Sequence, residues 1–175
     1  CTQIDMRTGN ATSSTPQTVR LDAGVWQLME KCFGGGTRVG GRAYITAKRP
    51  GLQAVVEQFL KSVGYASLVD GNVLHFVGAG NLDNGSVISP EQFILSQEIG
   101  DGLDWLTAAP VIIPPGDAAE RLAECIRDGQ DFLTSEHTLA HFRDERWDPA
   151  FFQYGADTPT EKAILDQCHA YYMDK

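Results

Sequence analysis

The chain has 175 residues, 42% of them hydrophobic, which is enough for one ordinary domain with a sizeable core. Its formal net charge of −9 argues against binding to nucleic acids or anionic membranes, because both need clustered basic side chains, and the densest basic cluster is only Lys48-Arg49. No apolar run approaches the ~18 residues that span a bilayer. The four cysteines are widely spaced and form no C-x-x-C pair, which favours reduced thiols in a cytoplasmic protein. The chain opens with Cys1 and not with a Met, so we expect it to be part of a longer protein.

Short apolar runs that alternate with longer segments of helical periodicity predict an α/β fold. The first expected strand is Thr2–Met6. A helix is expected over Val19–Phe33, and the glycine run that follows would end it. The apolar face of this helix would consist of Leu21, Val25, Leu28, Met29 and Cys32.

The second expected strand is Ala43–Thr46, and the third is Val73–Val77. Between them, Pro50 opens a helix, because the missing N–H of proline costs nothing at a first helical position. Apolar residues recur along this helix with the spacing of a single buried stripe. The stripe is formed by Leu52, Val55, Val56, Phe59, Leu60 and Val63.

The C-terminal half predicts four more helices. A capping box at Ser89–Gln92 starts one that runs to about Leu106, and a second box at Asp117–Glu120 starts another. A short helix is expected over Ser135–Arg143, and Thr158–Glu161 would cap the last helix. The apolar face of that last helix would be formed by Ile164, Leu165, Cys168, Tyr171 and Tyr172.

Two histidines raise the question of a metal site. His137 and His141 are four residues apart, so a helix would place both imidazoles on one face, with Asp144 or Glu145 one turn further on as a third ligand. The H-E-x-x-H order of zinc peptidases is missing, because Glu136 precedes the first histidine. We therefore favour a solvated face or a helix-packing role, and we predict no metal site.

Two glycine-rich stretches could suggest nucleotide binding. Residues 33–42 lack the G-x-x-x-x-G-K-[ST] pattern of a phosphate loop. The stretch Val77–Gly80 follows an expected strand, but Asp83 stands where a dinucleotide fingerprint has its third glycine, and the next helix begins only near Ser89. We therefore interpret this second stretch as a sharp loop that needs positive φ at its glycines.

In α/β folds, ligands bind at the carboxyl ends of the strands. The polar residues expected at that position are Asp5, Thr46, Lys48, Asn81 and Asp83. No Ser-His-Asp or Cys-His nucleophile pattern can be read from spacing, so the catalytic residues stay unknown. The residues by themselves indicate a binding region and name no reaction.

Five stretches in chain order carry a further signal. They read D-M-R-T-G over 5–9, T-A-K-R-P-G-L-Q-A-V-V-E over 46–57, G-A-G-N-L-D-N-G over 78–85, S-P-E-Q-F-I-L-S-Q-E-I over 89–99 and H-T-L-A-H-F-R over 137–143. Together they resemble segments of the corrinoid-dependent trimethylamine methyltransferases and of their relatives that lack pyrrolysine. Among those segments are D-M-R-T-G-A-P, (S/T)-D-A-K-x-P-x-x-Q-A-G-x-E and G-A-G-G-L-E-S-G.

The resemblance implies a TIM (β/α)8 barrel, which needs roughly 200–250 residues. We therefore expect one partial domain, the C-terminal portion of such a barrel. Parallel strands and outer helices would occupy about residues 1–108, and trailing C-terminal helices would occupy 109–175. The open sheet edges of a partial barrel would make the segment poorly stable on its own. The two histidines would then belong to a C-terminal packing helix.

The resemblance also implies a reaction. Family members move a methyl group from a methylated amine to the cobalt(I) of a corrinoid, or cobalamin, which a separate small protein carries; this chain itself would bind no cofactor. A quaternary ammonium substrate favours aromatic faces and acidic groups. Tyr44, Asp5 and Asp83 fit such a lining by position, and Tyr44 thus joins the candidate substrate-binding residues. Each also has a structural alternative, in which Tyr44 packs against a helix and the two acids form turns.

The sequence departs from the family pattern in several places. Pyrrolysine is not present, and ordinary residues fill the Lys48–Arg49 region, which favours a relative that acts on glycine betaine or another quaternary amine. The Asp of the T-D-A-K pattern has no counterpart, which could reflect another substrate or lost activity. The alternatives are a non-catalytic α/β domain that binds methylated amines and an unrelated small domain. The oligomeric state, a homo-oligomer included, and the identity of the corrinoid partner stay open.

Overall fold

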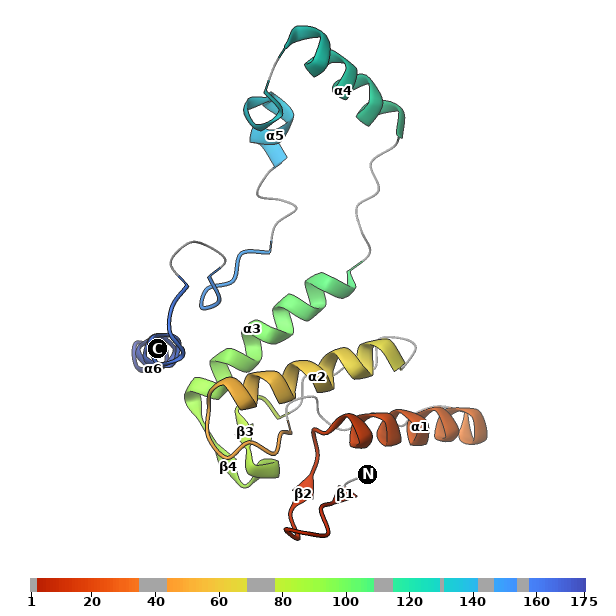
Figure 1. Cartoon of the computed structure of the whole chain (residues 1–175), viewed down its shortest axis with the longest axis vertical. Coiled ribbons are helices and arrows are strands. Elements are labelled where there is room, and N and C mark those ends of the chain that lie inside the picture. The colour runs from red at the N-terminus through yellow and green to blue at the C-terminus, as the bar shows by residue number, and fades with distance from the viewer. Residues whose placement is uncertain are drawn as a thin grey trace. The chain divides into compact units, whose positions relative to one another are not determined.

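The computed structural model describes residues 3–34, 44–68, 78–108, 115–129, 131–141, 147–153 and 158–175. These residues form a mixed α/β structure in which helices predominate (Figure 1). The chain divides into two compact units, one formed by Cys1–Thr107 with Pro149–Lys175 and the other by Ala108–Asp148. Among the described helices, none combines the length and the apolar character needed to cross a membrane.

Four helices make up most of the first unit. They are α1 (Pro16–Phe33), α2 (Leu52–Leu68), α3 (Pro90–Thr107) and α6 (Glu161–Met173). Helix α2 packs between α1 and α3, and α6 packs on α3 (Figure 1). All four were expected from the sequence. The expected bounds of α1 and α3 agree with the structure within three residues, α2 begins two residues after the expected Pro50, and α6 begins at the last residue of the expected capping stretch Thr158–Glu161.

Local capping explains where these helices begin. Helix α1 starts at Pro16, three residues before the expected start, because the Thr15 side chain accepts a hydrogen bond from the backbone N–H of Thr18. It ends, as expected, at Gly34, whose φ of 77° lies in the left-handed region. The capping box of α3 is confirmed, since the Ser89 hydroxyl accepts from the N–H of Gln92 at 3.2 Å.

The last helix begins at Glu161, and the residue that caps it is Thr160. Its hydroxyl oxygen accepts from the N–H of Ala163 at 3.2 Å. The expected apolar face is confirmed in part. Cys168 is fully buried with Leu95 and Phe151, and the partly buried Ile164 and Leu165 pack against them. Tyr171 and Tyr172 remain about half exposed.

The described strands are antiparallel, so the prediction of parallel strands is wrong for them. Strand β1 (Gln3–Ile4) pairs with β2 (Ala11–Thr12), and β3 (Asn81–Leu82) pairs with β4 (Val87–Ile88). The physical reason is tight reversal of the chain. After β1, the carbonyl of Asp5 accepts from the N–H of Gly9 at 2.7 Å, and the chain turns back through that glycine at φ 69°.

The other two expected strands have different outcomes. Within Ala43–Thr46, the described residues Tyr44–Thr46 are not a strand, and Val73–Val77 lies outside the described residues. No barrel is seen in the part of the chain that the structure describes.

Helix α2 buries a different face from the one that its periodicity predicts. The expected stripe is largely exposed in the described structure, with Val56, Phe59 and Leu60 between 45% and 50% accessible. The buried face carries Ala54, Gln58, Lys61, Ser62 and Tyr65. Gln58 and Lys61 can be buried there because Gln58 hydrogen-bonds to residues of α3 and Lys61 donates to the backbone carbonyl of Tyr44. The buried hydroxyl of Ser62 has no hydrogen-bond partner among the described residues. The expected face of α1 is also wrong, because its buried residues are Thr18, Val19, Ala23 and Trp26.

The described part of the second unit contains two helices and a short 3₁₀ turn. They are α4 (Pro115–Asp128), the 3₁₀ turn Phe132–Thr134 and α5 (Glu136–His141). Both helices were expected, with α4 starting two residues before its predicted box. The backbone of His137 and His141 lies in α5, but their side chains lie outside what the structure describes, so the choice between a metal-ligand role and a packing role stays a prediction.

Candidate substrate-binding site

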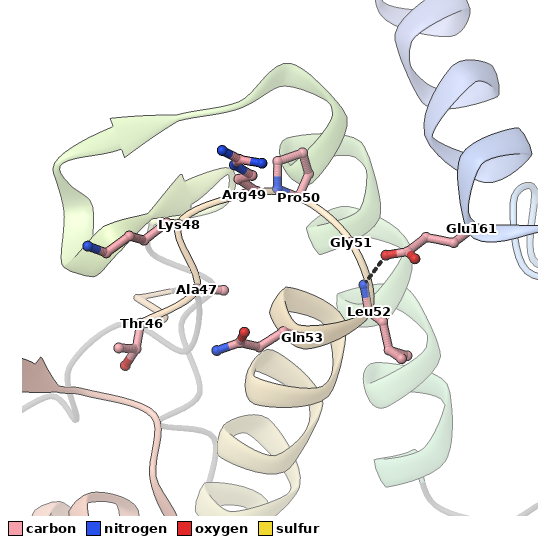
Figure 2. Close-up of a pocket in the computed structure, with 9 residues that line it drawn as sticks. All are labelled: Thr46, Ala47, Lys48, Arg49, Pro50, Gly51, Leu52, Gln53 and Glu161. Atoms are coloured by element: carbon pink, nitrogen blue, oxygen red, sulfur yellow. Dashed lines mark hydrogen bonds between the residues drawn. The ribbon is translucent and has the colours of Figure 1, made fainter.

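An open pocket of about 520 Å³ lies in the first unit, at the start of α2 (Figure 2). The loop before α2 and the first turn of that helix supply most of its wall, and one residue comes from α6. The lining residues are Thr46, Ala47, Lys48, Arg49, Pro50, Gly51, Leu52, Gln53 and Glu161. Two of the sequence-predicted binding residues, Thr46 and Lys48, therefore line a common cavity.

Glu57 of α2 fixes the part of this wall that is formed by Thr46 and Ala47. One carboxylate oxygen, Oε2, accepts from the backbone N–H groups of Thr46 at 2.7 Å and Ala47 at 3.0 Å. The same oxygen accepts from the hydroxyl of Ser14 at 2.6 Å, and the other oxygen accepts from the amide of Gln53 at 2.6 Å. Hydrogen bonds to a carboxylate are about twice as strong as neutral ones, so the loop is firmly attached to the helix.

The glycine loop over residues 78–85 packs against Tyr44. Gly78 and Gly85 have φ of 94° and 93°, and a Cβ at these positions would lie only 3.1 and 2.9 Å from atoms of the Tyr44 ring. Side chains other than hydrogen would therefore collide with the ring. The expectation of positive φ at the loop glycines is confirmed, since Gly80 also has φ of 78°.

Backbone hydrogen bonds fix the two loops to each other. The N–H of Asp83 donates to the carbonyl of Ala47 at 2.8 Å, and the N–H of Asn84 donates to the carbonyl of Ile45 at 2.8 Å. Asn84 also joins the first hairpin to the site, because its Oδ1 accepts from the Ser13 hydroxyl at 2.5 Å. Three segments far apart in the sequence thus meet at this point.

Five of the six predicted binding residues come together in this region. Tyr44, Thr46 and Lys48 belong to the loop before α2, and Asn81 and Asp83 belong to the glycine loop that is hydrogen-bonded to it. The Asn81 amide lies beside Gly78, where a Cβ would be 2.9 Å from its nitrogen, on the same glycine that the Tyr44 ring contacts.

Asp5 is placed differently. Its carboxylate accepts from the N–H of Arg7 at 3.0 Å and from the Thr8 hydroxyl at 3.1 Å, both within its own turn. The backbone hydrogen bond from Arg7 holds the pKa of the Asp5 carboxyl below its usual value. Among the described residues, no hydrogen bond or ion pair joins Asp5 to the other five, and its turn-forming alternative accounts for its position.

Charged groups around the pocket remain available for a ligand. Lys48 and Arg49 are exposed and, like the carboxylate of Asp83, form no ion pair with any residue that the structure describes. Tyr44 is 37% exposed, so this residue is not fully covered by its neighbours. The region therefore offers a cation-binding aromatic face and an acidic group on one loop pair, and basic groups on the pocket wall.

Within the described ranges, no three His, Cys, Asp or Glu side chains are grouped so that they could hold a metal ion. Several residues that shape the site were not among the sequence-based candidates. They are Ser13, Ser14, Glu57, Lys61, Asn84 and Glu161. Only Glu57 had a signal in the sequence, because it closes the Q-A-x-x-E part of the second motif.

The class of protein follows from a comparison with known families. A sequence model of the family described as trimethylamine methyltransferase (MTTB) matches residues 1–159, which include the pocket wall except for Glu161, the glycine loop and Tyr44. The chain belongs to the trimethylamine methyltransferase family, and this membership indicates methylamine methyltransferase activity in general. No curated protein sequence matches the chain.

Proposed function

We propose that this chain is the C-terminal portion of a methyltransferase barrel that removes a methyl group from a quaternary amine. The acceptor is the cobalt(I) of a corrinoid bound to a partner protein. The observation that carries the proposal is the family match over residues 1–159, which contains the loops around Tyr44 and all of the described pocket wall except Glu161.

The chain's own residues would bind and orient the substrate. The Tyr44 ring suits a quaternary ammonium, which has no N–H to donate and is attracted by aromatic faces, and Tyr44 is 37% exposed. The carboxylate of Asp83, which forms no ion pair with a residue that the structure describes, adds a favourable charge. Methyl transfer is an in-line displacement, in which the carbon–nitrogen bond breaks and its electron pair stays on the nitrogen. The methyl group passes to the acceptor, and the nitrogen leaves as the uncharged nitrogen of a tertiary amine. Holding the methyl carbon on this axis supplies much of the rate.

The basic groups of the pocket favour a substrate that also carries a carboxylate. Lys48 and Arg49 are exposed on the pocket wall, just before the start of α2. Glycine betaine combines a trimethylated ammonium with a carboxylate at a short distance. A betaine-type substrate therefore uses both kinds of group, whereas trimethylamine uses only the aromatic and acidic ones.

The direct test uses the complete protein with a corrinoid protein reduced to cobalt(I). Loss of the cobalt(I) absorbance is followed with glycine betaine, trimethylamine and tetramethylammonium, each added separately. We expect turnover with glycine betaine, and we expect Lys48→Ala to raise KM for betaine by about tenfold while leaving KM for tetramethylammonium unaffected.

Three results would contradict all or part of the proposal. No absorbance change with any of the amines would exclude this reaction for them. Calorimetric binding of an amine without turnover would instead favour the alternative, a non-catalytic domain that binds methylated amines. Turnover with trimethylamine alone would keep the reaction class and overturn the betaine assignment.

A further inference from the structure

Helix α2 presents two opposite charges to the same loop, one turn apart. Glu57 accepts from the N–H groups of Thr46 and Ala47 at 2.7 and 3.0 Å. Lys61 donates from Nζ to the carbonyl oxygen of Tyr44 at 2.8 Å. Each charge thus meets the backbone group of opposite polarity, so the two side chains hold the peptide groups of residues 44–47 in one orientation.

This orientation determines where the Tyr44 ring lies. The ring is in contact with Gly78 and Gly85, at positions where a Cβ would come within 3.1 and 2.9 Å of ring atoms. A rotation of the Tyr44 peptide would carry the ring away from these glycines or against them. The position of the aromatic face therefore depends on the hydrogen bond that Lys61 makes to the Tyr44 carbonyl.

Lys61 is buried, with 3% of its surface exposed. Among the described residues, the charged groups that act on it are Asp22 of α1 and Glu57 of its own helix, and its Nζ lies 6.0 Å from the centre of the Tyr65 ring. Burial lowers the pKa of Lys61 to about 8, against the opposing effect of the two acids. Tyr65 donates to Asp22 at 2.8 Å, and burial raises the pKa of its phenol.

We propose that Glu57 and Lys61 are positioning residues for the substrate pocket, and that the charge of Lys61 controls how tightly the pocket holds its methylated amine. The proposal rests on the proposed function for its substrate and adds a regulation of that site by pH. Neutral Lys61 still has N–H groups, but its hydrogen bond to the Tyr44 carbonyl loses the contribution of the charge. The loop then loosens, and the aromatic face is no longer held in place.

The first test measures methyl transfer by the complete protein between pH 6.5 and 9.5. For the wild type, KM should rise about tenfold as the pH passes through about 8, with kcat at saturating substrate nearly constant, because a charge-assisted hydrogen bond contributes roughly a factor of ten. Lys61→Arg keeps a positive charge throughout this range, so its KM should not change with pH. Lys61→Met should show a raised KM at every pH.

Glu57→Gln is a second test, because a purely structural role of Glu57 would not predict a shift in the pH midpoint of KM. Because Glu57 raises the pKa of Lys61, removing its charge should shift the midpoint of the KM profile to lower pH. Circular dichroism checks that each variant is folded. If KM of Lys61→Arg rises with pH as it does in the wild type, the titration belongs to another group and the proposal is overturned.

A readout without substrate separates this proposal from the proposed function. The ¹³C shift of the Tyr44 carbonyl is followed by NMR in the selectively labelled complete protein. It should titrate with a midpoint near pH 8 in the wild type and stay constant in Lys61→Arg. If this titration is present but no amine is bound or demethylated, the proposed function fails and the positioning pair stands. If the carbonyl does not titrate, the proposal fails whatever the activity.

Discussion

Gly51 and Glu161 fit together at the junction of α2 and α6. The Glu161 carboxylate accepts a hydrogen bond from the N–H of Leu52 at 2.6 Å, across 109 residues of sequence (Figure 2). A Cβ at Gly51 would lie 2.3 Å from the same oxygen, and Gly51 has a φ of 139°. The absence of a side chain at residue 51 is therefore what allows α6 to supply the N-terminal capping group of α2.

Gly51→Ala should lower the free energy of unfolding by about 2 kcal/mol. The alanine is strained at positive φ, and its methyl group displaces the Glu161 carboxylate from the end of α2. Denaturant unfolding of the complete protein measures the change. Gly24→Ala is the matched control, because its Cβ meets nothing within 4 Å in the interior of α1, and it should stabilise the protein by about 1 kcal/mol. Equal effects of the two substitutions would contradict this explanation.

A double-mutant cycle separates the two causes of the Gly51→Ala effect. In a Glu161→Ala background the carboxylate is already gone, so only the backbone strain remains. We expect Gly51→Ala to cost about 1 kcal/mol less in that background than in the wild type. Full additivity would show that the contact between the two residues contributes nothing to stability.

Glu98 of α3 has a comparable role for the chain that precedes α6. It is 7% exposed, and its Oε1 accepts from the N–H groups of Phe151 at 2.6 Å and Phe152 at 3.0 Å. Glu98→Leu would leave both N–H groups without this acceptor, so we expect a loss of about 3 kcal/mol in unfolding free energy. Glu98→Gln keeps an oxygen acceptor and should cost less than half as much. Urea titration of both variants makes the comparison, and equal losses would rule out the role of the oxygen.

The helices could be predicted well because their signals are local. The Ser89 capping box and the glycine at residue 34 act within one turn of the helix ends, and both are observed where the sequence placed them. The first hairpin was missed although its signal is local too. Asp5 and Gly9 form a turn of ordinary composition, but the α/β pattern predicts that the residues before it belong to a parallel sheet.

Which face of a helix is buried is not a local property. The apolar stripe of α2 is real, but the face that α1 and α3 cover in the described structure is the polar one. A buried network makes this possible, because Gln58 accepts hydrogen bonds from Gln92 and Ser96 at 3.0 Å each. Periodicity locates a stripe but does not say which surface will meet it.

The residues of the candidate site also fall into two groups, those that could be predicted from local sequence and those that could not. Residues at loop positions, such as Thr46 and Asp83, could be chosen because loops after secondary-structure elements carry binding groups. Glu161 could not, since its partner is 109 residues away in sequence. Lys61 was hidden by its place in a helix with an apolar stripe, where a lysine usually faces solvent.

The cysteines should differ strongly in reactivity. Cys32 is exposed, whereas Cys168 is fully buried, and burial raises the pKa of the Cys168 thiol to about 11. At pH 8 iodoacetamide should modify Cys32 at least ~100-fold faster than Cys168, as measured by peptide mass spectrometry over time. In denaturant the two rates should converge. Rapid modification of Cys168 in the folded protein would contradict the burial of α6 against α3.

The binding role proposed for Tyr44 predicts a specific order among its variants. Tyr44→Phe keeps an aromatic face, so the affinity for a quaternary ammonium should stay within about threefold of the wild type. Tyr44→Leu fills similar space without that face and should weaken binding by about tenfold. Calorimetry with tetramethylammonium measures both. If the Tyr44→Leu and Tyr44→Phe proteins bind tetramethylammonium equally well, Tyr44 has only the packing role against Gly78 and Gly85.

The burial of Lys61 also predicts how stability depends on pH. Rising pH should increase the unfolding free energy, although it should weaken binding in the pocket. The pKa of Lys61 is about 8 in the folded protein, below the 10.5 of an unburied lysine. Between these two pH values the unfolded chain binds more protons than the folded one, so this group makes the unfolding free energy rise with pH. The rise should total about 3 kcal/mol by pH 11, measured as the difference between wild type and Lys61→Met, and should be absent below pH 7. A difference that stays constant from pH 7 to 11 would show that Lys61 titrates normally, and the pH control of the pocket would then have no physical basis.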